Sequence, residues 1–273
     1  MHAPGFMSSG HRWKPNGLTT WTTDFGLEGA FVGTMKAVFI SGFPSGRWVD
    51  LSHGVAPQDT HAAALELRHA YPYFPEGSLH VAIVDPGVGT LRRILIAEKA
   101  GHAFLAPDNG LLGGVLEEGD PVWSPDPSPW ELPAKSSTFH GRDVFTPMAA
   151  ALASGRLALE AADLFPTWDR GQQVPPLALE PGIFEIHVLL VDHFGNLVTN
   201  WDVSQSGPLH ERAEVRIGSH VVPIVKTYAD VPCTDVLALI NSLGHLEIAQ
   251  RNGSASDRLH LGVGDVLELR NKP

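Results

Sequence analysis

The sequence predicts an α/β domain, with a mostly parallel sheet flanked by helices, followed by an all-β, barrel-like domain. In the first part of the chain, short β-type runs alternate with longer helix-type runs, which is typical of a parallel sheet covered by helices. After a stretch rich in proline and glycine, only short β-type runs follow, as in small antiparallel barrels and sandwiches. A length of 273 residues is enough for two such domains.

The helices and strands of the first part follow from its apolar periodicity. Glu28–Phe39 carries apolar residues near helical spacing, and Asp59–Phe74 is an Ala- and Leu-rich run that begins with a potential cap, Asp59. A third helix is expected from its potential cap, Asp143, to Gly155. Strands are expected over Leu18–Thr23, Arg47–Leu51, His80–Val84, Ile94–Glu98 and Ala103–Leu105.

We expect the chain to divide into four segments. Residues 1–17 are expected to be a flexible leader, residues 18–170 the α/β domain and residues 183–273 the β-barrel domain. The linker between the domains, residues 171–182, carries three prolines and two glycines, which interrupt regular structure. Strands of the second domain are expected over Phe184–Val191, Leu197–Trp201, Ala213–Ile217, Val221–Lys226, Val236–Ile240, Leu246–Ala249 and Val266–Arg270.

Composition argues against several classes of protein. Acidic residues outnumber basic ones by 30 to 19, so a nucleic-acid partner is not expected. No apolar run reaches the length of about 20 residues that a membrane-spanning helix needs, and the N-terminus lacks the apolar core of a signal peptide. We therefore expect a cytoplasmic protein with no membrane partner.

The single cysteine, Cys233, excludes an internal disulfide framework and is expected to be a small buried residue.

Aspartates recur just after the predicted strands. In α/β sheets ligands bind outside the carboxyl ends of the strands, and a following glycine lets the backbone approach a ligand closely. Several carboxylates in this position indicate a site for a polar small molecule, although Asp-Gly and Asn-Gly pairs are also ordinary turn formers. The strand-end aspartates are Asp24, Asp50, Asp85, Asp108 and Asp192.

The loop that begins at Asp85 differs from known phosphate-binding loops. Its sequence, Asp-Pro-Gly-Val-Gly, is not G-x-G-x-x-G and lacks the lysine of a P-loop, and a leading aspartate would repel phosphate. A neutral or cationic ligand suits it better. Arg92 follows in the same loop and His140 precedes a predicted helix, so a carboxylate, a guanidinium and an imidazole could together hold and polarise a water molecule. Alternatively, His140 is a helix cap or a surface residue.

The 14 histidines raise the question of metal chemistry. His61 and His69 are eight residues apart and fit no zinc-protease pattern, and a G-x-S-x-G nucleophile motif is absent from the sequence. We expect no metal site, and a metal-dependent hydrolase that uses the histidines remains an alternative.

Five motifs in order resemble one known family. The chain resembles the S-adenosylmethionine (SAM) hydrolases, also called SAM hydroxide adenosyltransferases, which are related to fluorinase and chlorinase. The similarity runs from about Leu18 to Arg270, and a C-terminal Asn241-Ser242 and Leu246-Glu247-Ile248-Ala249 stretch fits as well. The motifs are Thr22-Thr23-Asp24-Phe25-Gly26, Val84-Asp85-Pro86-Gly87-Val88-Gly89 with Arg92-Arg93, Ala106-Pro107-Asp108-Asn109-Gly110, Phe139-His140-Gly141-Arg142-Asp143 and Asp192-His193-Phe194-Gly195-Asn196.

The resemblance implies a reaction and an assembly. The reaction is hydrolysis of SAM to adenosine and L-methionine by attack of water on the ribose C5′, without a cofactor, and the assembly is a homotrimer with each site between neighbouring subunits. The family's Asp–Arg–His set matches Asp85, Arg92 and His140 here. Whether Asp85 or His140 is the base stays open at this point.

The resemblance also implies substrate-binding residues. Asp24 matches the residue that holds the ribose hydroxyls, and Asn196 matches a residue near the ribose. The methionine end is expected at Asp192 and Ser242. The adenine ring is expected between two aromatic residues, Phe194 and Tyr228.

Departures from the halogenase pattern favour hydrolysis. The halogenases carry a Tyr at the position of Asp85, fluorinase carries a Thr at that of Val88, and an additional loop follows this region. A carboxylate at position 85 would repel a halide but could accept a proton from water. Leu243 stands where the halogenases have an Arg that binds the methionine carboxylate, so recognition of that group differs. The alternatives are a SAM-dependent halogenase and a non-catalytic adenosine or SAM sensor.

Overall fold

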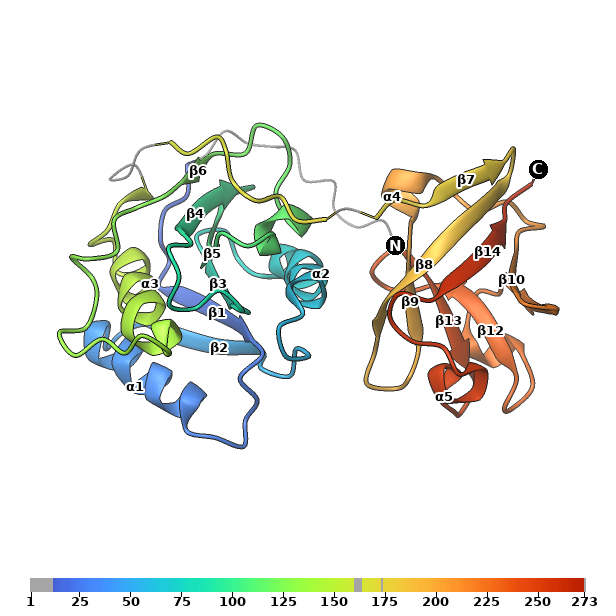
Figure 1. Ribbon diagram of the computed structural model, residues 1–273, viewed down its shortest axis with the longest axis horizontal. Helices are drawn as coiled ribbons and strands as arrows, with labels where there is room; N and C mark the ends of the chain where they lie inside the picture. The colour runs from blue at the N-terminus through green and yellow to red at the C-terminus, as the bar shows by residue number, and fades with distance from the viewer. Residues whose placement is uncertain (1–11, 160–163, 173, 273) are drawn as a thin grey trace. The chain divides into compact units, whose positions relative to one another are not determined.

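The computed structural model describes residues 12–159, 164–172 and 174–272. The chain forms two compact units, Met1–Gln172 (unit 1) and Gln173–Pro273 (unit 2), which are described separately (Figure 1). An α/β unit therefore precedes a β unit, which confirms the predicted fold class.

Unit 1 is built on a six-stranded sheet with the order β2-β1-β3-β5-β4-β6. The strands β2, β1, β3 and β5 are parallel to their neighbours, whereas β4 pairs antiparallel with both β5 and β6. The carboxyl ends of the four parallel strands consequently meet at one edge. The strands are β1 (Leu18–Thr23), β2 (Arg47–Ser52), β3 (Leu79–Ile83), β4 (Ile94–Lys99), β5 (His102–Pro107) and β6 (Val122–Trp123).

Helices cover both faces of this sheet. Helices α1 and α3 pack together over one face, and α2 lies over the other (Figure 1). Met35 and Phe39, four residues apart on α1, are fully buried in the core together with Trp21 of β1. The helical elements are α1 (Phe31–Gly42), α2 (Thr60–Ala70), η1 (Tyr71–Tyr73), η2 (Leu111–Gly114), the π-helix η3 (Gly141–Phe145) and α3 (Thr146–Ala153).

The two predicted aspartate caps have different outcomes. Asp59 caps α2 by accepting a hydrogen bond from the Ala62 backbone N–H at 2.8 Å, as predicted. Asp143 does not cap a helix, so that prediction is wrong. It is buried inside η3, where its carboxylate accepts hydrogen bonds from Arg142 and from the Ser136 backbone.

The segment before β1 is more ordered than the sequence predicts. Residues 1–11 of the expected leader lie outside the described residues. Trp13, however, is buried against the core of unit 1, and its indole N–H donates to the Ser78 carbonyl at 3.1 Å. Asn16 and Gly77 are joined by a backbone hydrogen bond of 3.0 Å. Residues 12–17 therefore belong to the folded unit, because the large indole finds an apolar site there.

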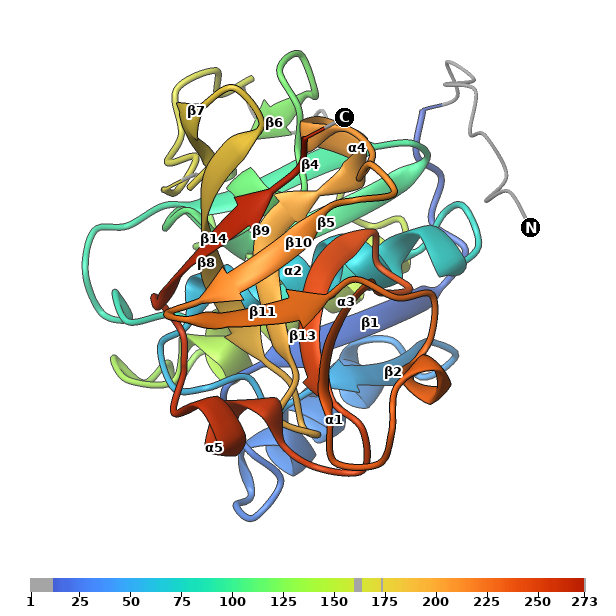
Figure 2. The same cartoon turned by 90° about the vertical axis from the view of Figure 1, so that its right-hand side faces the viewer.

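Unit 2 is an antiparallel, barrel-like sheet with the order β11-β10-β14-β8-β9-β13-β12, to which β7 adds beside β8 (Figures 1 and 2). Its core is formed by inward-facing apolar side chains such as Trp201, Val215 and Ile248. Strand β7 falls within the expected linker. The elements are β7 (Leu177–Glu180), β8 (Ile183–Val191), β9 (Leu197–Asp202), α4 (Val203–Ser206), β10 (Glu214–Ile217), β11 (His220–Pro223), η5 (Tyr228–Asp230), β12 (Val236–Ile240), β13 (His245–Gln250), α5 (Ala255–Leu259) and β14 (Val266–Arg270).

The cysteine prediction is wrong. Cys233 is exposed, because it lies in a turn before β12 in which the next residue, Thr234, has a φ of 71°. Within the described parts of the chain, no helix is long and apolar enough to cross a membrane.

Candidate active site

A pocket of about 410 Å³ lies in unit 1 beside the carboxyl ends of β1 and β3. Because these strands are parallel neighbours, the residues that follow them, Asp24 and Asp85, lie at the same edge of the sheet. The segment before η3 brings His140 to the same place. The pocket is lined by Asp24, Phe25, Phe31, Gln58, Ile83, Asp85, Pro86, Val88, Thr138, Phe139, His140 and Gly141.

Arg92 joins Asp85 to His140. Its Nε lies 2.7 Å from Oδ1 and 2.8 Å from Oδ2 of Asp85, and its Nη2 also donates to Oδ2. The same Nη2 lies 3.1 Å from Nδ1 of His140. The Asp85 and Arg92 side chains are both nearly buried, at 5% and 9% exposure, so this forked pair is shielded from water. The structure thus brings together the three residues that the sequence groups as a water-holding set.

The guanidinium of Arg92 determines the tautomer of His140. A guanidinium can only donate, so Nδ1 of His140 must accept, and the ring proton resides on Nε2. Burial lowers the pKa of His140, and the positive charges of Arg92 and Lys135 lower it further. His140 is therefore a neutral imidazole whose Nε2–H can donate a hydrogen bond.

Two glycines allow close packing around the pocket. A Cβ at Gly141 would lie 3.0 Å from the ring of Phe25. Gly89 has a φ of +79°, and a Cβ there would lie 2.8 Å from the Ser137 carbonyl. Both loops that carry the Asp85–Arg92–His140 set therefore need glycine at these points.

Residues that the motif analysis did not assign complete the pocket. Phe31 meets the ring of Phe139 edge-on at 5.1 Å, and Phe25 meets Phe139 at 5.8 Å. Gln58 adopts a φ of 68°, rare for a residue with a side chain, and its backbone N–H donates to Asp24 at 2.8 Å. Gln58 follows Pro57 in a loop, and no sequence spacing connects it with Asp24.

Of the four strand-end aspartates in unit 1, two do not line the pocket. Asp108 accepts a hydrogen bond from the Asp169 backbone N–H, and the neighbouring Asn109 donates to the Val84 carbonyl at 2.8 Å. That loop therefore supports the end of β3. Asp50 is hydrogen-bonded to His53 and other side chains of its own region.

In unit 2, Asp192 organises its own turn. Its Oδ1 accepts hydrogen bonds from the backbone of Phe194 and Asn196 at 2.8 and 2.9 Å, and its Oδ2 accepts from the Asn196 side chain at 2.9 Å. Phe194 is 72% exposed at the tip of this turn. Asp192 and Asn196 are therefore in direct contact, with a largely exposed aromatic ring beside them.

The buried carboxylate of Glu247 fixes the position of the Tyr228 side chain in unit 2. The Tyr228 hydroxyl donates to Oε1 of Glu247 at 2.8 Å, and Asn241 donates to Oε2 at 3.1 Å. Burial raises the pKa of Tyr228 to about 12, with Glu247 and Asp192 adding to the effect. Burial likewise raises the pKa of Glu247, and the charge of Asp192 adds to it.

The turn between β12 and β13 carries Ser242. The side chain of Asn241 accepts hydrogen bonds from the Leu243 and His245 backbones at 3.0 and 3.1 Å, which fixes this turn. The sequence assigns no role to Glu247, although a charged residue between two apolar ones in a predicted strand is a recognisable signal. No group of three or more His, Cys, Asp or Glu side chains arranged for a metal ion occurs among the residues that the structure describes.

Comparisons with known families cover both units. Residues 19–162 match the family described as SAM hydroxide adenosyltransferase N-terminal domain, and residues 186–268 match the SAM hydroxide adenosyltransferase C-terminal domain. The crystal structure of an uncharacterized conserved protein from Thermotoga maritima superposes with a TM-score of 0.83 at 33% identity. It covers 92% of this chain and 99% of that one.

Relatives of known activity include hydrolases and, at lower identity, a halogenase. The (R)-S-adenosyl-L-methionine hydrolase of Thermus thermophilus is 39% identical over 90% of this chain and 97% of its own length, and that of Salinispora arenicola is 35% identical over 92% and 96%. A fluorinase from an Actinoplanes species is 26% identical over 91% and 96%. The chain therefore belongs to the SAM hydroxide adenosyltransferase family.

Proposed function

We propose that this protein hydrolyses SAM to adenosine and L-methionine. The observation that carries the proposal is the Asp85–Arg92–His140 set, in which Arg92 joins two residues of the pocket wall, in a chain whose relatives include named SAM hydrolases. The pocket volume of about 410 Å³ lies within the range of small-molecule sites.

The reaction needs positioning more than activation of a leaving group. Water attacks C5′ of the ribose as the C5′–S bond breaks, and the electron pair of that bond neutralises the sulfonium as methionine leaves. The positive sulfur is already a good leaving group, so no general acid is required. The protein must instead hold water and C5′ in line and remove competing solvent.

Asp85 is the base in this proposal. Nδ1 of His140 accepts from Arg92 and its Nε2 carries a proton, so the neutral imidazole has no free lone pair for a water proton. The Asp85 carboxylate retains acceptor capacity beyond its bonds to Arg92. Water therefore gives its proton to Asp85, while the Nε2–H of His140 orients the water oxygen.

The remaining site residues keep the roles that the family resemblance implies. Asp24, oriented by the backbone of Gln58, binds the ribose hydroxyls, and Asn196 lies near the ribose. Asp192 and Ser242 bind the methionine end. Phe194 and Tyr228 enclose the adenine ring, and Glu247 fixes the direction of the Tyr228 hydroxyl.

The assembly and setting are part of the proposal. We infer a homotrimer with sites between subunits. Two apolar side chains are exposed in this region: Phe31 of the pocket wall at 52%, and Leu27 two residues after Phe25 at 72%. Their exposure supports this assembly, since a neighbouring subunit would cover them. Light scattering on the purified protein tests it. A cytoplasmic location, independence of any cofactor and the absence of a nucleic-acid partner remain predictions.

Chromatography of the products distinguishes the alternatives. Incubation with SAM is expected to yield adenosine and methionine in equal amounts, with or without chloride or fluoride, and also with a chelator. Formation of 5′-halo-adenosine would identify a halogenase, and loss of activity with the chelator would identify a metal-dependent hydrolase. Tight binding of SAM in calorimetry with no methionine formed would identify a sensor. A wild-type rate of adenosine release from Asp85→Ala would overturn the assignment of the base.

A further inference from the structure

The segment after β2 holds the turn that carries Asp24 into the pocket. This turn, residues 24–26, follows Thr23 at the end of β1, and the two strands are parallel neighbours. The Gly26 N–H donates to the His53 carbonyl at 2.8 Å, and the Gln58 N–H donates to the Asp24 carboxylate at 2.8 Å. Strand β2 and its loop therefore support one wall of the pocket without supplying a catalytic group.

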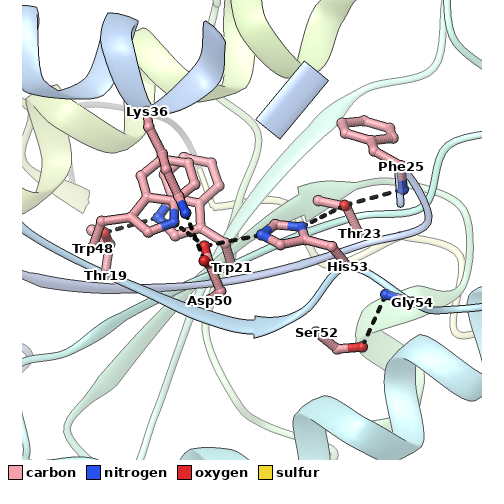
Figure 3. Close-up of polar contacts among 10 residues, drawn as sticks. All are labelled: Thr19, Trp21, Thr23, Phe25, Lys36, Trp48, Asp50, Ser52, His53 and Gly54. Carbon is pink, nitrogen blue, oxygen red and sulfur yellow. Dashed lines mark hydrogen bonds and ion pairs between the residues drawn. The ribbon is translucent and has the colours of Figure 1, made fainter. Parts of the chain in front are cut away.

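A chain of side-chain hydrogen bonds leads into the same turn (Figure 3). Oδ1 of Asp50 lies 3.1 Å from Nε2 of His53, and Nδ1 of His53 lies 2.8 Å from the hydroxyl of Thr23. That hydroxyl in turn accepts a hydrogen bond from the Phe25 backbone N–H at 3.2 Å. We call Asp50, His53 and Thr23 the turn relay.

Each hydrogen bond of the turn relay can run in only one direction. An ionised carboxylate can only accept, so Asp50 accepts from Nε2 of His53, which carries the proton of the neutral imidazole. Nδ1 of His53 then accepts from the Thr23 hydroxyl, whose oxygen in turn accepts from the Phe25 N–H. A change at Asp50 that moves the imidazole proton from Nε2 to Nδ1 would turn Nδ1 into a donor to the Thr23 hydroxyl. The hydroxyl oxygen would then accept from His53 as well as from the Phe25 N–H, which alters its hydrogen bond to Phe25.

Asp50 is itself held in place. Lys36 donates to its Oδ2 at 2.6 Å, the Trp48 indole N–H donates to Oδ1, and the Trp48 ring stacks on Trp21 with centroids 3.7 Å apart. Burial raises the pKa of Asp50, but the hydrogen bonds from Lys36, Trp48 and His53 outweigh it, so this pKa lies below its usual value. The relay thus begins at a charged, oriented carboxylate.

The turn relay is not a hydrolytic triad. Thr23 is fully buried, and its hydroxyl is engaged both as donor and as acceptor. His53 is buried as well, with a side-chain exposure of 1%. Neither group can reach a substrate, so any effect on the reaction must pass through the turn.

We propose that Asp50 and His53 are positioning residues that act through the Thr23 hydroxyl to orient Asp24 and Phe25 in the substrate pocket. Phe25 and Asp24 both line the pocket, and the relay ends on the backbone N–H between their side chains. Because this inference rests on the proposed function for the identity of the ligand, its test includes a measurement that needs no turnover.

Thr23 offers a matched set of variants. Thr23→Val keeps the shape of the side chain but removes the hydroxyl, and Thr23→Ser restores it. The adjacent Thr22 is a control, since among the described residues its buried hydroxyl has no hydrogen-bond partner. We expect Thr23→Val to raise KM for SAM about five- to tenfold while kcat changes less than about twofold, as for loss of one to two hydrogen bonds that act on binding. Thr23→Ser and Thr22→Val are expected to keep the wild-type KM.

Asp50→Asn tests whether the effect travels along the relay. An asparagine amide can reverse the imidazole tautomer, so Asp50→Asn is expected to raise KM in the wild-type background but not in the Thr23→Val background. Additive effects of the two substitutions would overturn the proposal. An unchanged KM in Thr23→Val, or an equal rise in Thr22→Val, would also overturn it.

Amide hydrogen exchange separates this proposal from the proposed function. Thr23→Val is expected to exchange faster than Thr22→Val in a peptide covering residues 24–31, with the rest of unit 1 unchanged. Equal exchange in the two variants overturns the relay. If the wild-type protein releases no adenosine from SAM, the proposed function fails, and the exchange measurement still decides on the relay.

Discussion

Nε of Arg92 lies 2.7 and 2.8 Å from the two carboxylate oxygens of Asp85, in a pair that is almost fully shielded from solvent. A planar guanidinium fixes a carboxylate in orientation as well as in charge. The pair thereby presents the remaining lone pairs of Asp85 in a fixed direction, which is the requirement for a base that must act on one particular water molecule.

Asp85→Asn removes the proposed base but keeps the shape of the side chain. Because the amide cannot accept the water proton, we expect kcat for adenosine release to fall at least about 100-fold. The Kd for SAM, measured by calorimetry, is expected to stay within a few-fold of that of wild type. A kcat within tenfold of wild type would show that another group takes the proton.

Arg92→Lys keeps the positive charge but loses the two-pronged hydrogen bonding of the guanidinium to both oxygens of Asp85. Lysine can contact only one carboxylate oxygen at a time and cannot also reach His140 in the same geometry, so kcat is expected to fall about tenfold or more. Arg216→Lys is a matched control, since Arg216 pairs with Glu214 in unit 2 through a 2.8 Å contact. Similar losses in both variants would point to a general effect of removing an arginine.

The pH dependence of kcat tests the state of His140. Its pKa lies below the usual value of about 6.5, first because of burial and then because of Arg92, so the ring is neutral at pH 7. As the pH falls through this lowered pKa, Nδ1 gains a proton and can no longer accept from Arg92. We expect full activity at pH 7 and an acid limb below pH 6.5 that His140→Gln moves to lower pH. An unmoved limb would exclude His140 as its origin.

A buried histidine away from the pocket makes the protein sensitive to acid. Burial, with a smaller contribution from His102, lowers the pKa of His80 to about 3, against about 6.5 in the unfolded chain. Between these values the unfolded state binds a proton that the folded state does not. Stability is therefore lost as the pH falls from 6.5, by up to about 1.4 kcal/mol per pH unit.

Denaturant unfolding at a series of pH values measures this loss. His80→Gln, whose amide does not titrate, is expected to flatten the dependence of the free energy of unfolding on pH below 6.5. His220→Gln alters an exposed histidine and is expected to leave it unchanged. Parallel curves for His80→Gln and wild type would contradict the assignment.

Two substitutions of Tyr228 distinguish the contribution of its aromatic ring from that of its hydroxyl. Tyr228→Phe keeps the aromatic face and is expected to keep the affinity for adenosine, but to cost about 1 kcal/mol of stability because Glu247 loses a donor. Tyr228→Leu is expected to weaken adenosine binding about three- to tenfold, as for loss of one aromatic contact. Tyr73→Leu, at a residue that is 82% exposed, serves as the control. Equal affinities in calorimetry for Tyr228→Leu and Tyr73→Leu would exclude adenine stacking on this ring.

The sequence predicts those parts of the fold and site that depend on local pattern. The alternation of elements, the Asp59 cap and the proximity of Asp24 to Asp85 all follow from periodicity and from the geometry of parallel strands. The π-helical turn at Gly141–Phe145 does not, because Asp143 pairs with Arg142 instead of capping the helix.

Residues that act through tertiary contacts escaped prediction. Gln58 and Phe139 matter because of what other segments bring next to them, and their spacing in sequence carries no such information. Glu247 stands out in the sequence as a charged residue between apolar ones, but its partner Tyr228 does not follow from the sequence. Trp13 is buried although its surroundings in sequence suggest a flexible segment, since the indole packs on a distant core. Cys233 shows the reverse: a residue type that is usually buried lies exposed in a turn.

Hydrolysis of SAM in ¹⁸O-labelled water tests the central claim most directly. If water held by Asp85 attacks the ribose C5′, mass spectrometry will show one ¹⁸O in the 5′-hydroxyl of adenosine and none in methionine. Adenosine without the label, or a 5′-halo-adenosine when halide is present, would contradict attack of water on C5′.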